Sequence, residues 1–233
     1  MTENIKAVIF DCDGVLVDSE IIVITEKINA LKEIDLYYTI DDFRNDYIGL
    51  DEDEFYKKIA TDLNRQFKKS LPAFVREKID ESIIKKFHQE VNAIEGISQL
   101  LTNLTHKRCV ASSNNAEILK IKLEKSNLYD HFCPYIFSRE MVTRGKPCPD
   151  LFLFAAQRLE VESKDCIVVE DSINGIRAAK SAGMLPIGFI GGTHLVPAYG
   201  NELQKVGAAH VFTTAGDLGR FLSQYVNLRS QAV

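Results

Sequence analysis

The stretch Ile5–Ser19 limits what this chain can fold into more than any other. Its apolar run Ala7–Phe10 is short and rich in strand-forming residues, as expected for a buried parallel strand. The run breaks off into Asp11-Cys-Asp-Gly14, which places two carboxylates at the end of that strand. Such carboxylates repel each other and resist burial, so we expect a cation or a charged substrate beside them. An ordinary polar turn with an Asp-Gly step is the alternative.

Beyond residue 94, short apolar runs alternate with helical patterns. Strands are expected over Cys109–Ser113, Tyr135–Phe137, Cys166–Val169, Leu185–Phe189 and His210–Thr213. Helices are expected over 96–104, 115–126, 149–159 and 173–182, with a last helix behind the sixth strand. This alternation predicts an α/β fold with a Rossmann-like parallel sheet covered by helices on both faces. In such sheets, ligands bind beyond the carboxyl ends of the strands.

Residues 18–88 have a different character, because helical patterns follow one another there without a strand. Asp51 and Glu54 resemble a helix capping box, and Pro72 suits the first turn of a further helix. The apolar residues at helical spacing are Ile21, Ile24, Ile28 and Leu31, then Phe55, Ile59, Leu63 and Phe67, then Val75, Ile79, Ile83 and Phe87. We therefore expect a helical cap domain over 18–88, inserted into a core formed by 1–17 and 89–233.

Composition excludes several classes of function. The net charge of −5 over 233 residues argues against nucleic acid as the main partner, which needs a clustered basic surface. No apolar run reaches membrane-spanning length, and no signal peptide is recognisable. The five cysteines are scattered without a Cys-x-x-Cys pair, which favours reduced thiols. We expect a cytoplasmic protein without membrane contact, as a monomer or small homo-oligomer.

Polar residues follow several of the predicted strands. The Cys109 strand ends in Ser112, the Cys166 strand runs into Glu170-Asp171, and Lys146 lies in a loop that enters a helix. Together with Asp11 and Asp13, these ends would gather four carboxylates, a hydroxyl and an ammonium in one crevice. Phosphoryl transfer needs such a set, because oxygen ligands hold Mg²⁺ and the cations balance charge on the transferring phosphate.

These segments also resemble a known family. Asp11-Cys-Asp-Gly-Val-Leu-Val-Asp18, Ser112, Gly145-Lys-Pro-Cys-Pro-Asp150 and Glu170-Asp-Ser-Ile-Asn-Gly-Ile-Arg-Ala-Ala179 look like the four motifs of the haloacid dehalogenase superfamily. Within it, the chain most resembles the β-phosphoglucomutase-like and phosphoglycolate-phosphatase-like enzymes, which carry a helical cap. The resemblance covers about Ile5 to Gly191, with the motifs in order.

The resemblance implies a role for each acidic residue. Asp11 would be the nucleophile that forms an aspartyl-phosphate, and Asp13 the general acid and then the base. We expect neighbouring carboxylates to raise the pKa of Asp13 toward the range that its acid role needs. Mg²⁺ would be bound by the Asp11 carboxylate, the Asp13 backbone carbonyl and Asp171, with Glu170 bound directly or through water. A purely structural role is the alternative for Glu170.

The phosphate would be held by Ser112 and Lys146, helped by backbone amides near Cys12 and Ser113. A helix N-cap is the alternative for Ser112, and a surface ammonium for Lys146. Asp18 would be a hydrogen-bonding group at the cap hinge.

Departures from the family separate a phosphatase from a mutase. The resembling hexose-phosphate mutases carry a histidine in the first cap helix and an arginine after the cap-loop glycine, where this chain has Val23 and Glu52. We therefore expect a Mg²⁺-dependent phosphatase that acts on a small phosphorylated sugar, sugar acid or polyol. A β-phosphoglucomutase-type mutase and a catalytically silent regulatory protein are the alternatives. Within the cap, function is expected in the loops, especially Tyr47-Ile-Gly-Leu-Asp51. Selectivity is expected in the loop near Gly49 to Asp53 and in the crevice that it closes on.

Overall fold

A six-stranded, all-parallel sheet forms the centre of the molecule. The computed structural model describes residues 5–47, 50 and 52–227. The sheet has the strand order β3-β2-β1-β4-β5-β6, which confirms the predicted α/β fold class. Its strands are β1 (Ala7–Phe10), β2 (Lys107–Ala111), β3 (Ile136–Phe137), β4 (Cys166–Glu170), β5 (Leu185–Phe189) and β6 (His210–Phe212). The central strand β1 pairs with β2 and β4, so the residues that follow it lie in the middle of one sheet edge.

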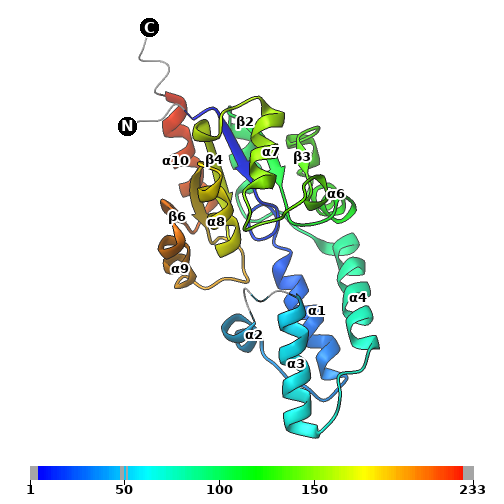
Figure 1. Ribbon diagram of the computed structural model, residues 1–233. Coiled ribbons are helices and arrows are strands. Elements are labelled where there is room, and N and C mark those ends of the chain that lie inside the picture. Colours follow the sequence, from blue (N-terminus) through cyan, green and yellow to red (C-terminus); the bar gives the residue numbers. More distant parts are fainter. Residues whose placement is uncertain (1–4, 48–49, 51, 228–233) are drawn as a thin grey trace.

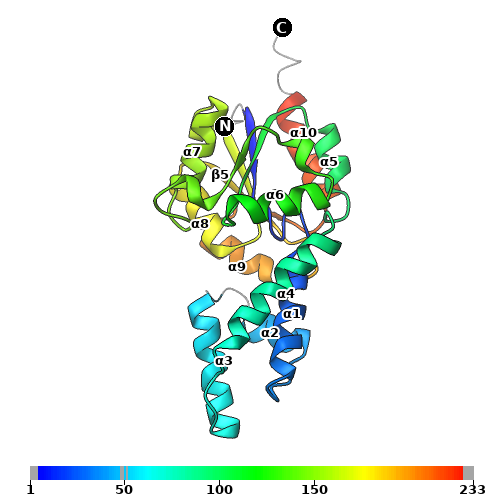
Figure 2. The ribbon, with the colours of Figure 1, turned by 90° about the vertical axis from the view of Figure 1, so that its right-hand side faces the viewer.

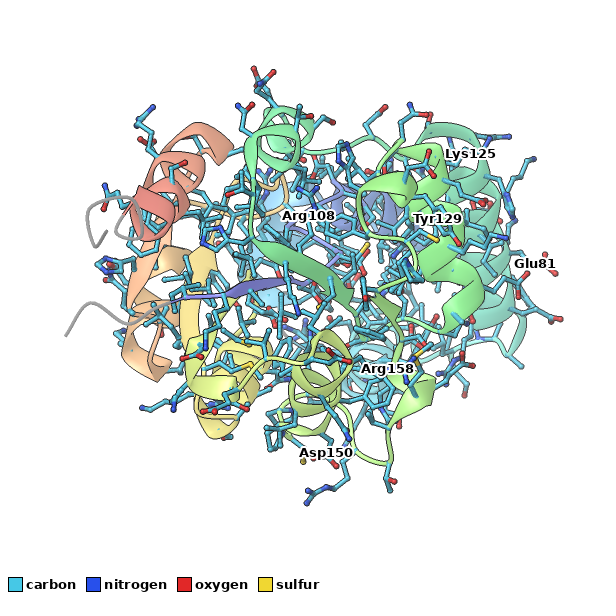
Figure 3. All side chains as sticks on the ribbon, turned by 90° about the horizontal axis from the view of Figure 1, so that it is seen from above. Glu81, Arg108, Lys125, Tyr129, Asp150 and Arg158 are labelled. Carbon is cyan, nitrogen blue, oxygen red and sulfur yellow. The ribbon has the colours of Figure 1, made fainter. Side chains whose placement is uncertain are left out.

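Helices cover both faces of the sheet. On one face lie α5 (Ile97–Asn103), α6 (Ala116–Lys125) and α10 (Ala215–Asn227), packed against Val8 and Phe10. On the other lie α7 (Asp150–Leu159) and α8 (Ile173–Ser181), packed against Ala7 and Ile9. Figure 3, seen from above, shows Asp150 and Arg158 of α7 on the opposite side of β1 from α5. The alternate residues of β1 thus serve two hydrophobic layers, as expected for a buried parallel strand.

Two short α-helices of the described residues were not predicted. One is α9 (Tyr199–Val206), which packs beside α8; its apolar residues Tyr199, Leu203 and Val206 recur at helical spacing, so a periodic signal was present and was missed. The other is α2 (Ile40–Asp46) in the cap, where the Thr39 hydroxyl accepts from Asp42 N and the Asp42 carboxylate accepts from Thr39 N. This capping box was a readable signal.

Four helices form the cap at the carboxyl end of the sheet (Figure 1). They are α1 (Glu20–Lys32), α2, α3 (Glu52–Phe67) and α4 (Phe74–Glu90). Most of the apolar residues predicted on these helices form a core separate from that of the sheet, with Ile59, Leu63 and Ile79 fully buried. The prediction was wrong for Phe67, whose side chain is exposed, and for Phe87, which belongs to the core of the sheet. Pro72 lies two residues before α4. Asp51 of the predicted capping box lies outside the described residues.

The cap joins the core through two adjacent chain segments. Asp18 N donates to Asn92 O at 3.0 Å and Ile94 N donates to Leu16 O at 3.0 Å. Val17 and Ala93 form an antiparallel bridge between these bonds. Helix α4 runs from the cap along α1 to α6 (Figure 2). Its residue Phe87 belongs to the hydrophobic core on the α5, α6 and α10 face of the sheet. We propose the cap as residues 18–88, with its second boundary in the last turns of α4.

Across the described ranges, none of the helices has both the length and the apolar character that a bilayer crossing requires. Each of the five cysteines is a free thiol.

Candidate active site

A cavity of about 550 Å³ lies between the carboxyl edge of the sheet and the cap. The core contributes its floor, and α1, α2 and α3 contribute its wall. The floor includes Asp11, Asp13, Ser113, Lys146, Glu170 and Asp171. The wall includes Glu20, Val23, Lys27, Phe43, Tyr47 and Phe55. Six residues from four separate motifs of the sequence are thus brought together, and the cap lies directly over them.

Lys146 lies between two carboxylates of the floor. Its Nζ is 2.5 Å from Asp11 Oδ1 and 2.6 Å from Glu170 Oε1, and its side chain is only 4% exposed. Burial disfavours the ammonium, but Asp11 and Glu170 outweigh this and raise the pKa of Lys146. The surface alternative for Lys146 is wrong, because the side chain reaches from its loop to the end of β1.

Asp13 has a separate set of partners. Its carboxylate accepts hydrogen bonds from Lys122 Nζ, Ser19 Oγ and Asn114 Nδ2. Burial alone would raise the pKa of Asp13, but Lys122 and these hydrogen bonds outweigh burial and lower it. Our expectation of a raised pKa was wrong, because it counted neighbouring carboxylates and missed the ammonium.

Lys122 is the most informative residue that the sequence analysis missed. Its side chain is 3% exposed, and its Nζ also lies 4.3 Å from the centre of the Phe87 ring on α4. It lies on α6 three residues after Leu119 and directly beside Leu123, and both leucines are fully buried. A lysine within the apolar stripe of a helix is a signal that could have found it.

Three buried carboxylates could hold a metal ion. Asp11, Glu170 and Asp171 each offer one oxygen, and these oxygens lie within 4.8 Å of one another. Lys146 neutralises one of the three charges, which leaves about two negative charges, the amount that a divalent cation balances. Burial raises the pKa of Asp11 and raises that of Asp171 to about 6, as expected where this charge is unbalanced. The donor set therefore fits Mg²⁺, which prefers carboxylate oxygens.

Two glycines make room for these carboxylates. Gly14 has a φ of +70°, and a Cβ there would overlap the Asp171 carboxylate. A Cβ on Gly175 would overlap the Glu170 carboxylate. Glu170 is held on its other side by Ser172, whose N and Oγ donate to Oε2 at 2.9 Å and 2.8 Å. Both Glu170 oxygens are therefore hydrogen-bonded.

The two serines after β2 lie in different environments. Ser112 is completely buried, and its Oγ accepts from Asn114 N at 3.2 Å and Asn114 Nδ2 at 2.8 Å. Ser113 and Asn114 line the cavity. Asn115 caps α6 by accepting from Ile118 N, so the N-cap alternative for Ser112 is wrong.

A loop after β5 was also missed. His194 is 5% exposed, and its Nε2 lies 3.2 Å from Asp171 Oδ2. Thr193 N donates to Asp18 Oδ1 at 3.0 Å, which is the hinge contact expected of Asp18. From the cap, Arg44 donates to the carbonyls of Thr193 and His194. This loop therefore touches the hinge, the cap and a candidate metal ligand, and a Gly-Gly-Thr-His sequence alone does not reveal such contacts.

The positions used to judge mutase activity lie apart. Val23 lines the cavity. Glu52 is the first residue of α3, half-exposed and paired with Arg76 at 2.9 Å. Of the cap loop expected to carry function, Ile48, Gly49 and Asp51 lie outside the described residues, while Tyr47 and Leu50 line the cavity.

Comparisons with known proteins agree with this geometry. The 6-phosphogluconate phosphatase of Escherichia coli is 29% identical over 194 residues, which cover 83% of this chain and 86% of that protein. The β-phosphoglucomutase of Bacillus subtilis is 32% identical over 195 residues, 78% of this chain and 82% of that protein. A hydrolase from Deinococcus radiodurans, solved with bound phosphate and sodium, superposes with a TM-score of 0.85 and 29% identity, over 96% of this chain and 97% of that one. The sequence model of the haloacid dehalogenase-like hydrolase family matches residues 8–189, and the chain belongs to that family.

Proposed function

We propose that this hydrolase is a phosphatase that removes phosphate from a small phosphorylated metabolite through an aspartyl-phosphate on Asp11. The observation that carries the proposal is the position of the Asp11 carboxylate. It lies at the end of the central strand, on the cavity floor, 2.5 Å from the Lys146 ammonium. Phosphatase names among the relatives and the phosphate bound in the Deinococcus protein support this choice.

The reaction takes two displacements. An Asp11 oxygen attacks phosphorus, the bond to the substrate oxygen breaks, and Asp13 gives that oxygen a proton. A water molecule that has lost its proton to Asp13 then attacks the phosphorus, which releases phosphate and regenerates Asp11. The pair with Lys122 keeps Asp13 ionised, as the second displacement needs. For the first displacement Asp13 must already carry a proton, which it takes up from solvent, and this uptake requires its contacts with Lys122 to loosen.

Mg²⁺ would be held by carboxylate oxygens of Asp11 and Asp171 and by the Asp13 backbone carbonyl. Glu170, with both oxygens hydrogen-bonded, would reach it through water. When bound, Mg²⁺ offsets the repulsion between Asp11 and the incoming phosphate. Lys146, Ser112 and the backbone near Ser113 would take the remaining phosphate oxygens.

Mutase activity is the second candidate, because a β-phosphoglucomutase is among the relatives. It needs a cation in the cap for the second phosphate of a bisphosphate. Glu52 at the family's arginine position is a carboxylate already paired with Arg76, which favours the phosphatase.

A phosphatase screen over phosphorylated metabolites with Mg²⁺ tests the first candidate. Incubation with β-glucose 1-phosphate and a trace of its 1,6-bisphosphate tests the second, since a mutase would form glucose 6-phosphate faster than free phosphate.

We also propose a cytoplasmic location and a monomer or small homo-oligomer, with no nucleic-acid or membrane partner. A sizing column with light scattering checks the oligomeric state.

A further inference from the structure

One face of α1 points into the cavity from the cap. Glu20, Val23 and Lys27 follow one another at helical spacing on that face, and all three line the cavity. Aromatic rings from α2 and α3 complete this wall, with Phe43 and Phe55 buried in the cap core. The wall is therefore largely apolar, with a few charged groups set into it.

Lys27 is unusual among these charged groups. Its side chain is half-buried, and its Nζ lies 4.2 Å from the centre of the Phe55 ring. No carboxylate in the described ranges lies within ion-pair distance of that nitrogen. Burial lowers the pKa of Lys27, against the more distant Glu52, Glu20 and Asp80, which raise it. A half-buried ammonium that lies over an aromatic ring, with no carboxylate partner among the described residues, gains free energy when an anion binds beside it.

The other lysine of the cavity is not available for this purpose. Lys146 is held between Asp11 and Glu170 at the floor. Arg44 donates to carbonyls of the 193–194 loop, and among the described lining residues there is no arginine. Lys27 is thus positioned to meet the end of the substrate farthest from the reacting phosphate.

We propose that Lys27 binds a carboxylate of the substrate, so that the preferred substrates are phosphorylated sugar acids. This inference rests on the proposed phosphatase function and narrows it. A single negative charge suits the site better than a second phosphate, because Glu20 and Glu54 line the same wall and repel a dianion more strongly. The hydroxyl groups between the two ends of a sugar acid would hydrogen-bond to these carboxylates.

A matched pair of substrates isolates the carboxylate. 6-Phosphogluconate and glucitol 6-phosphate share chain length and hydroxyl pattern, and differ at the far end, where one has a carboxylate and the other a hydroxymethyl group. The wild-type enzyme should show a kcat/KM about tenfold or more higher for the acid, as expected for a charge-assisted contact. The preference should lie mainly in KM, because Lys27 does not touch the reacting atoms.

Two variants at this position test the role of the charge. Lys27→Met keeps the aliphatic stem over Phe55, and should lower kcat/KM for the acid about tenfold while leaving glucitol 6-phosphate within about twofold. Lys27→Arg keeps the charge and should restore most of the preference. The matched control is Lys58→Met, since Lys58 also lies over a cap ring, 4.4 Å from the centre of Tyr47, but does not line the cavity. It should leave both substrates unchanged.

The outcomes separate this inference from the proposed function. Equal kcat/KM for both substrates in the wild type, or an equal loss on both in Lys27→Met, would overturn the role of Lys27. A preference for glucosamine 6-phosphate, which carries an ammonium, would overturn it too. In each of these cases phosphate is still released and the phosphatase stands. Release of no phosphate from these compounds or from p-nitrophenyl phosphate would instead reject the phosphatase itself.

Discussion

The floor and the wall of the cavity hold their charges in opposite ways. Lys146 on the floor and Lys122, which pairs with the floor residue Asp13, have side chains only 4% and 3% exposed, and each touches a carboxylate. On the wall, Lys27 is half-buried and has a ring as its near neighbour. Groups fixed by several partners are positioned before substrate arrives, as a reaction needs. Groups left open to a ligand select among substrates. Changes to the floor should therefore reduce kcat, and changes to the wall should alter KM.

The largest effect is expected on the floor at Asp11. Asp11→Asn keeps the size of the side chain but removes the nucleophile, so kcat should fall by at least about 10³-fold. The melting temperature should not fall, because an amide beside Lys146 carries no burial penalty for charge. Steady-state phosphate release measures kcat, and a thermal melt measures the melting temperature. Asp150→Asn is the matched control, because the Asp150 carboxylate pairs with Arg144 outside the cavity. Activity within about tenfold of wild type would remove Asp11 from the mechanism.

The second effect concerns the buried pair of Asp13 and Lys122. Lys122→Met leaves the Asp13 carboxylate buried without its ammonium, which should cost about 3 kcal/mol of stability and lower kcat about 10²-fold. Adding Asp13→Asn to Lys122→Met removes the unpaired charge, so the double variant should recover most of the lost stability while staying inactive. Urea unfolding of Lys122→Met, Asp13→Asn and the double variant, each compared with the wild type, measures this coupling. Additive losses in the double variant would show that the pair is not coupled.

The third effect is the response of the floor to Mg²⁺ and pH. The pKa of Asp171 is raised from 3.8 to about 6, so the folded protein binds more protons than the unfolded chain between these values. The metal-free protein therefore loses stability as the pH rises through this window. Bound Mg²⁺ offsets that loss. At about pH 5, however, Asp171 is about nine-tenths protonated, and the proton competes with Mg²⁺ for the carboxylate.

Millimolar Mg²⁺ should therefore raise the melting temperature by several degrees at about pH 7.5 and much less at about pH 5. Differential scanning fluorimetry with and without EDTA measures the shift. Asp171→Asn should abolish it at both pH values. An equal shift at the two pH values in the wild type would place the ion elsewhere.

The smallest effect is expected at the junction between wall and floor. Arg44→Gln removes the contacts of α2 with the carbonyls of Thr193 and His194, which should raise KM about threefold and change kcat less. Arg65→Gln, which loses only a pair with Asp62 within α3, is the control. A drop in kcat as large as that of Lys122→Met would mean that the cap contact also positions the reacting groups.

The sequence revealed the floor better than the wall. Asp11, Lys146, Glu170 and Asp171 each follow or precede a strand or helix with a clear pattern, and parallel strands must bring such ends together. The pairing of Lys122 with Asp13 spans 109 residues and depends on which way one helix is turned, which single-sequence patterns fix only weakly. The predicted direction of the shift in the pKa of Asp13 was wrong for that reason.

The wall depends on how a whole helical domain is placed over the sheet. The spacing of Glu20, Val23 and Lys27 shows that they share a face of α1, but not that this face meets the cavity. The short helix α2, which supplies Phe43 and Arg44, was missed, so its contacts with the core could not be expected. Packing between domains, and not local pattern, decides these positions.

The crossing of the chain at Leu16–Asp18 and Asn92–Ile94 has a consequence beyond holding the cap in place. Because the insertion leaves and re-enters the core at neighbouring, hydrogen-bonded positions, its two ends are already joined. A different lid, or a short turn, could be spliced between them without changing the path of any strand. The reacting groups and the selecting groups are therefore separable units, and one chemistry can be transferred to new substrates by exchanging a single contiguous segment.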